Sequence, residues 1–167
     1  PPVGGLIDSG AQYSVIDRSL FAALGLTEVF TLPMVAYGVG GDAQVGRGTT
    51  LDVAVGGLRL DGLRAAILGL GPLAGPQGLA APLILGQDVL RRLVLELNTP
   101  ERRLRLSGRE GWSPPAEVRP IPVTRSGRAL QAAITVEGVE VQAVVDTGAS
   151  AILALTRETA RAAGLFD

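Results

Sequence analysis

The sequence predicts an all-β protein with a few short helices, built from two similar halves. Its 23 glycines and 11 prolines are a fifth of the 167 residues, well above their usual combined share of about 12%. They separate short runs in which apolar and polar residues alternate, and this spacing favours short strands joined by turns over long helices. A motif near the N-terminus recurs near the C-terminus, which predicts the two halves. The chain is 47% hydrophobic with only one Trp, two Tyr and three Phe, so the core is expected to be aliphatic.

The recurring motif is a strand that ends in a turn. Residues 6–11 read Leu-Ile-Asp-Ser-Gly-Ala, and residues 144–149 read Val-Val-Asp-Thr-Gly-Ala. In both copies a second short strand is expected to follow, and then a helical segment that ends in a glycine, at residues 18–26 and 157–165. Because residue order and type recur over about twenty positions, the chain is predicted to carry two copies of one unit.

The segments between and around the two motifs are predicted to form hairpins, one buried strand and one short helix. Alternating apolar and polar residues indicate the strands, and glycine-rich or proline-containing stretches indicate the turns. A glycine-rich tip is expected at residues 38–42 and a loop at residues 70–82. The expected strands lie at residues 34–37, 44–48, 51–55, 58–60, 65–68, 83–85, 93–97, 102–106, 129–136 and 139–145, and the helix runs from Gln87 to about Arg92.

These elements predict three segments. Residues 1–108 are expected to form a first lobe, residues 109–123 a proline-rich linker, and residues 124–167 the start of a second lobe. The second copy stops at Asp167, before any counterpart of the glycine-rich hairpin or of the apolar strand at residues 83–85. We therefore expect the chain to be clipped at both ends, with further residues or a partner chain completing the second lobe.

Three residue types are absent, and this excludes several kinds of chemistry. The sequence has no cysteine and no histidine, and all 15 of its basic residues are arginine. Disulfides, thiolate nucleophiles, zinc–cysteine sites, a Ser-His-Asp triad and lysine Schiff bases are therefore excluded. A net charge of −1 offers no attraction for nucleic acid, and no apolar stretch reads as a membrane span. No cofactor or metal site is expected, and carboxylates are the best candidates for catalysis.

The repeated turn puts a carboxylate where it could act on a substrate. Asp8 and Asp146 each follow an apolar strand and lie one residue before a glycine, which permits close approach of another backbone. The hydroxyls of Ser9 and Thr147 could lock the two turns together. Two facing carboxylates cannot both be ionised, so the pair would share one proton, and could act as base towards a water and as acid towards an amide. An aspartate that caps its own turn is the alternative at each position.

Residues 8–11 and 146–150, with Leu-Ile-Leu-Gly-Gln-Asp-Val-Leu at residues 83–90, resemble motifs of the retropepsin-like aspartic proteases. The bacterial two-repeat, gag-type enzymes are the most similar group. The resemblance implies an acid protease fold of two similar lobes, the second one truncated in this chain. It also implies an aspartic endopeptidase that hydrolyses peptide bonds with a water activated by an aspartate pair.

The resemblance assigns a role to each matching residue. Asp8 and Asp146 correspond to the catalytic aspartates. The other matching residues support the pair, line the substrate or flap, or pack behind the turn. They are Ser9, Thr147, Gly10 and Gly148 for support, Ala11 and Ala149 beside the substrate, Gly38, Val39, Gly40 and Gly41 in the flap, and Gly86 behind the turn.

Three hypotheses for function remain open from the sequence. The first pairs Asp8 with Asp146 in one chain that cleaves a peptide or protein substrate, with apolar side chains on either side of the bond. The second is a homodimer in which Asp8 pairs with Asp8 of a second chain. The third is a non-catalytic module that binds extended peptides or mediates assembly. No signal segment is visible, which leaves localisation open, although the resemblance would allow a periplasmic or exported bacterial protein.

Overall fold

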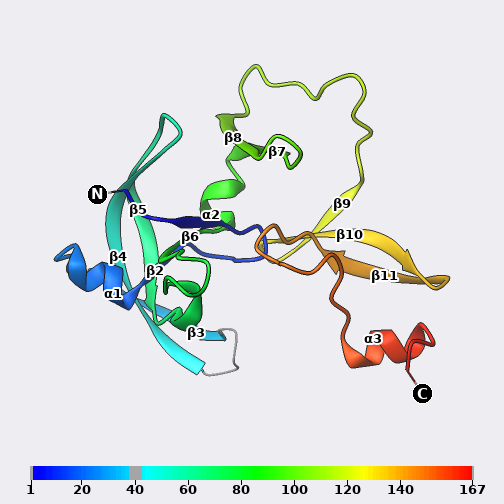
Figure 1. Ribbon diagram of the computed structural model, residues 1–167, viewed down its shortest axis with the longest axis horizontal. Coiled ribbons are helices and arrows are strands. Elements are labelled where there is room, and N and C mark those ends of the chain that lie inside the picture. The colour runs from blue at the N-terminus through cyan, green and yellow to red at the C-terminus, as the bar shows by residue number, and fades with distance from the viewer. Residues whose placement is uncertain (1, 38–42, 167) are drawn as a thin grey trace.

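The computed structural model describes residues 2–37 and 43–166, and they are mostly β-structure, with 41% strand and 13% helix. The all-β prediction with short helices is therefore confirmed. Figure 1 shows a six-stranded sheet at one side of the molecule and a three-stranded sheet at the other, with the long segment after β8 running between them.

The larger sheet contains the strands before and after the first motif, β1 and β2. Its strands run in the order β1-β6-β2-β5-β4-β3. The apolar strand β6 lies between β1, to which it is parallel, and β2, to which it is antiparallel. The bounds are β1 Gly5–Ile7, β2 Val15–Asp17, β3 Phe30–Tyr37, β4 Ala43–Val55, β5 Leu58–Leu68 and β6 Leu83–Leu85.

The long hairpin of β4 and β5 corrects one sequence-based prediction. The sequence predicts four short strands here, at residues 44–48, 51–55, 58–60 and 65–68, but the structure has two continuous ones. The register shifts between Leu51 and Val53, and Gly62 adopts a positive φ of 64° opposite this shift. The N–H of Gly62 donates to Oδ1 of Asp52 at 2.8 Å. In the sequence Gly62 indicates a turn, but in the structure it lies at a β-bulge through which β5 continues.

The helices are short. Asp17 caps α1 (Arg18–Ala23), since its Oδ1 accepts the N–H of Ser19 at 2.8 Å. Its Oδ2 accepts the N–H of Leu70 at 2.8 Å. Burial alone would raise the pKa of Asp17, but the hydrogen bonds from Ser19 and Leu70 outweigh it and lower the pKa. The other helical elements are η1 Gly71–Leu73, α2 Gln87–Leu90, which ends earlier than expected, and α3 Arg157–Ala162.

The core of the larger sheet is aliphatic, as the composition predicts. Its buried side chains come from β2, β5, β6 and α2, and burial of such side chains is the main source of folding free energy. They form two clusters, Ile16, Leu63, Ala65, Ile67, Leu83, Leu85 and Val89 in one and Val15, Ala66, Leu68 and Ile84 in the other.

The remaining strands form a hairpin and the smaller sheet. Strands β7 (Leu93–Asn98) and β8 (Arg103–Gly108) pair as predicted. The smaller sheet has the order β11-β10-β9, with bounds β9 Val123–Ser126, β10 Ala129–Val136 and β11 Val139–Val144. Strand β9 was not predicted from the sequence, and all of its residues are exposed. Residues 109–122 contain no helix or strand. In the described part of the chain, no helix is long and apolar enough to cross a membrane.

Candidate active site

The two repeated turns meet between the two sheets. In Figure 1 the blue loop after β1 and the orange loop after β11 come together at the centre of the molecule. The N–H of Asp8 donates to the carbonyl of Leu85 at 3.0 Å, and the N–H of Val145 donates to the carbonyl of Leu130 at 2.9 Å. Each turn is therefore held by a backbone hydrogen bond to a neighbouring strand, at the aspartate in the first turn and one residue before it in the second.

Crossed hydrogen bonds join the two turns. The N–H of Ser9 donates to Oγ1 of Thr147 at 3.0 Å, and the N–H of Thr147 donates to Oγ of Ser9 at 2.9 Å. Each hydroxyl also donates across the junction, Ser9 to the carbonyl of Val145 at 2.7 Å and Thr147 to the carbonyl of Ile7 at 2.8 Å. Each hydroxyl thus accepts one hydrogen bond and donates another across a partly buried junction.

The glycines of the two turns bring the aspartates close to each other. A Cβ atom added to Gly10 would lie 2.6 Å from Cγ of Asp146, and a Cβ added to Gly148 would lie 2.6 Å from Cγ of Asp8. Only glycine leaves room for such contact, because heavy atoms do not approach a real Cβ so closely. Each carboxylate therefore lies against the turn that carries the other one.

Hydrogen bonds orient the two carboxylates. Oδ1 of Asp8 accepts the N–H groups of Gly10 and Ala11, at 2.8 and 2.9 Å. Oδ1 of Asp146 accepts the N–H of Gly148 at 2.8 Å. In both turns one oxygen is held by the backbone, and this leaves the second carboxylate oxygen of each aspartate for other partners.

The electrostatic environment favours a proton on Asp8. Burial raises the pKa of Asp8, and the negative charge of Asp146 and a hydrogen bond with its side chain raise it further. The N–H groups of Ala11 and Gly10 act in the opposite direction but do not cancel this rise. A carboxyl with a raised pKa beside a second carboxyl is suited to acid–base chemistry.

Gly86 and Gln87 pack behind the first turn. A Cβ on Gly86 would lie 2.7 Å from the carbonyl carbon and oxygen of Tyr13, which are backbone atoms that cannot easily move. The buried Gln87 donates from Nε2 to the carbonyl of Ser9 at 3.0 Å and from its backbone N–H to the carbonyl of Ala11 at 2.8 Å. Gln87 is not among the site residues that the sequence predicts. A polar residue directly after the apolar strand is the signal that could have found it.

Arg128 links the second half of the chain to the segment that follows the first turn. Its Nη1 donates to the carbonyl of Gln12 at 3.3 Å, and its guanidinium stacks 4.1 Å above the centre of the Tyr13 ring. This contact was not predicted from the sequence, because 116 residues separate Arg128 from Gln12.

The remaining expected site residues are placed as follows. Ala11 lies beside the Asp8 carboxylate, to which its N–H donates, whereas Ala149 is exposed directly after Gly148. The expected flap residues Gly38, Val39, Gly40 and Gly41 lie outside the described residues. Within residues 2–37 and 43–166, no group of three or more acidic side chains is arranged to hold a metal ion.

A comparison with known protein families finds an aspartyl protease match. A family model described as aspartyl protease, from the retropepsin-like clan, matches residues 1–89, which is more than half of the chain. The matched region contains the first turn, the strand β6 and most of α2. Searches of curated proteins and of solved structures find no significant match.

Proposed function

The chain belongs to this aspartyl protease family of the retropepsin-like clan, which supports a general protease function, and we propose that it is an endopeptidase in which Asp8 and Asp146 activate a water. The observation that carries the proposal is the reciprocal packing of the two turns. Cγ of each aspartate lies 2.6 Å from the position that a Cβ would take on the glycine of the other turn. A pair of carboxylates in such contact can hold one proton and one negative charge at the same time.

In the proposed mechanism Asp8 begins protonated and Asp146 ionised. This assignment rests on burial, because Asp8 is half-buried, which favours its neutral form, whereas Asp146 is exposed. Asp146 takes a proton from the water as the water oxygen bonds to the scissile carbonyl carbon, and Asp8 gives its proton to the carbonyl oxygen. The resulting diol collapses when Asp146 protonates the amide nitrogen, the C–N bond breaks, and Asp8 takes back a hydroxyl proton. Both aspartates return to their starting states.

The proposed substrate is a peptide or an unstructured protein segment in an extended conformation. The aliphatic composition favours apolar side chains next to the scissile bond, and the expected flap at residues 38–41 would cover it. The crossed hydrogen bonds between Ser9 and Thr147 favour a pair formed within one chain over one formed by Asp8 and Asp8 of a homodimer, since they occupy the faces of both turns.

The direct test is cleavage of reduced, alkylated casein between pH 4 and pH 6, with product peptides identified by mass spectrometry. We expect internal cleavage that a pepstatin-type inhibitor blocks and that Asp8→Asn and Asp146→Asn each reduce strongly. If Asp146→Asn retained full cleavage, the Asp8–Asp8 homodimer would be favoured, and measurement of mass in solution would decide. If Asp8→Asn retained full cleavage, the proposed mechanism would be wrong.

A further inference from the structure

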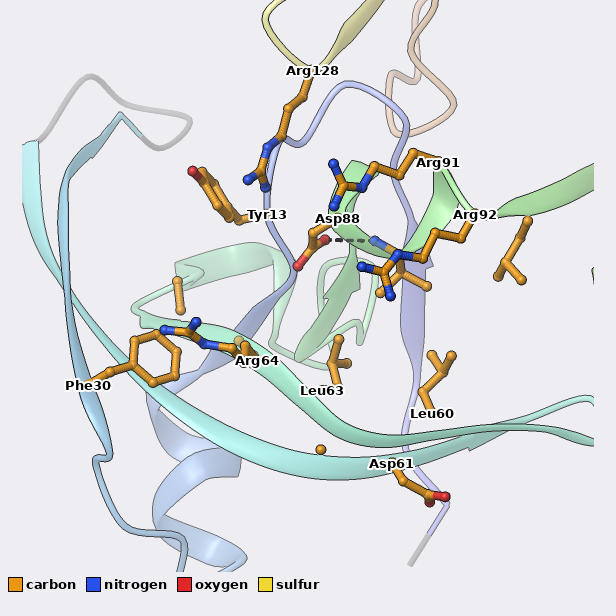
Figure 2. A pocket seen from close by; sticks show the side chains of 15 residues that line it. Tyr13, Phe30, Leu60, Asp61, Leu63, Arg64, Asp88, Arg91, Arg92 and Arg128 are labelled. Carbon is orange, nitrogen blue, oxygen red and sulfur yellow. Dashed lines mark hydrogen bonds between the residues drawn. The ribbon is translucent and has the colours of Figure 1, made fainter.

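A second polar feature includes Tyr13, five residues along the chain from Asp8. It is a pocket of about 660 Å³ between β5, α2, the segment after the first turn and the turn between β9 and β10. Figure 2 shows four arginine side chains that reach into this space from different parts of the chain. They are Arg64, Arg91, Arg92 and Arg128.

The pocket is positively charged, although the whole chain has a net charge of −1. Its lining contains the four arginines and two carboxylates, those of Asp61 and Asp88. Asp61 lies 3.2 Å from Arg59, which does not line the pocket. Oδ1 of Asp88 accepts the hydroxyl of Ser14 at 2.9 Å and the N–H of Val89 at 3.1 Å. Among the described residues, no ion pair within 4.0 Å joins either carboxylate to a pocket arginine.

Aromatic rings hold two of the arginines in place. The guanidinium of Arg64 stacks 4.1 Å above the centre of the Phe30 ring, and that of Arg128 stacks 4.1 Å above the Tyr13 ring. Stacking restricts these long side chains. Nη1 of Arg128 donates to the carbonyl of Gln12, and the other N–H donors at the edges of the two guanidinium groups can bind an anion. Arginine forms paired hydrogen bonds with carboxylates, so a pocket with several arginines suits a carboxylate ligand.

The pocket begins a short distance from the proposed catalytic pair. The N–H of Ala11 donates to Asp8, and Tyr13, two residues further on, already lines the pocket. Two residues of extended chain span at most about 7 Å. An extended substrate, which advances about 3.3 Å per residue, would therefore reach the pocket within a few residues of the bond at the aspartates.

We propose that this arginine-lined pocket receives the acidic side chain of a substrate, an aspartate or a glutamate about two to four residues from the scissile bond. The inference rests on the proposed protease function and adds a substrate class to it. The apolar preference expected next to the bond is unaffected, because the acidic residue lies further along the peptide.

The first test is a cleavage profile. A peptide library with blocked ends is digested, and the residues on both sides of each cleaved bond are counted. For a cleaved sequence we expect kcat/KM to fall by about tenfold or more when its glutamate is replaced by glutamine, as loss of a charge-assisted hydrogen bond implies. In Arg91→Gln/Arg92→Gln this preference should shrink to about twofold or less.

A matched control removes the same charge elsewhere. The double variant Arg109→Gln/Arg119→Gln also loses two exposed arginines. Both lie outside the pocket, in residues 109–122, which contain no helix or strand. It should keep the full preference for glutamate. An active wild-type enzyme with no preference for acidic residues, or an equal loss in the control variant, would overturn the inference and leave the proposed protease function standing.

A binding measurement separates the two proposals. Fluorescence anisotropy with a labelled, end-blocked glutamate peptide and its glutamine counterpart is carried out on Asp8→Asn, which should bind without cleaving. Tighter binding of the glutamate peptide, lost in Asp8→Asn/Arg91→Gln/Arg92→Gln, would support the pocket even if the wild-type chain cleaved nothing. Equal binding of both peptides would count against the pocket whatever the activity.

Discussion

Ser9 and Thr147 exchange hydrogen bonds in both directions, the N–H of each donating to the hydroxyl of the other, at 3.0 and 2.9 Å. The junction between the two halves is therefore made by the residues next to the aspartates themselves. Any change that loosens this junction should also change the distance between the carboxylates, so stability and activity are expected to respond together.

Removal of one hydroxyl tests this coupling. Thr147→Val keeps the shape of the side chain but leaves the N–H of Ser9 and the carbonyl of Ile7 without their partner. We expect the free energy of unfolding, measured in urea, to fall by about 1–3 kcal/mol, with a loss of cleavage. Thr147→Ser keeps the hydroxyl and is the matched control. Equal effects of the two substitutions would contradict a role for the hydroxyl.

Neutral substitutions of the aspartates test the proposed chemistry. Asp8→Asn and Asp146→Asn should each lower kcat by roughly 10²–10⁴-fold, the usual contribution of a general acid or base. Glu140→Gln, an exposed carboxylate on the strand that leads to Asp146, is the control and should leave kcat unchanged. Circular dichroism would establish that all three variants are folded.

The glycine of the second turn tests the closeness of the pair. In Gly148→Ala the new Cβ would lie 2.6 Å from Cγ of Asp8, so the carboxylate must move. A displacement of about 1 Å can lower the rate by about 10²-fold, and we expect a loss of that size. Gly108→Ala is the control, because a Cβ there meets nothing within 4 Å. Normal activity of Gly148→Ala would show that the two aspartates are further apart than described.

The raised pKa of Asp8 predicts how stability depends on pH. Because its folded-state pKa lies above the usual value of 3.8, the folded state binds the Asp8 proton more tightly than the unfolded state does. The stabilisation is complete below the unfolded-state pKa and is lost as the pH rises through the raised folded-state pKa. The free energy of unfolding of the wild type, relative to Asp8→Asn, should therefore fall as the pH rises from about 4. Urea unfolding at a series of pH values measures this difference, and a rise with pH would contradict the direction of the shift.

Much of the larger sheet could be predicted because its signals are local. The apolar run of β6 and the cap of α1 by Asp17 depend on neighbouring residues, and the structure has both. The continuous strands β4 and β5 were missed because Gly62 indicates a turn when its strand partner is unknown. Strand β9 was missed because all its residues are exposed and no apolar alternation marks it.

The site was only partly predictable for a related reason. The two Asp-hydroxyl-Gly turns are visible as a repeat, whereas the contact of Gln87 with Ser9 spans 78 residues. The arginine-lined pocket is formed by residues between Tyr13 and Arg128, and nothing in their spacing indicates that they meet. Contacts that depend on how distant segments pack cannot be inferred from local sequence patterns.

Strand β11 has a consequence for work with the purified protein. It lies at the edge of its sheet, and the exposed residues Val144 and Val145 lead from it to Asp146. An open edge with apolar side chains is a template on which another chain can add a strand. Chains in concentrated samples are therefore expected to associate through this edge, beside Asp146, and to precipitate and lose specific activity. A dilute sample that contains substrate should keep its activity longest.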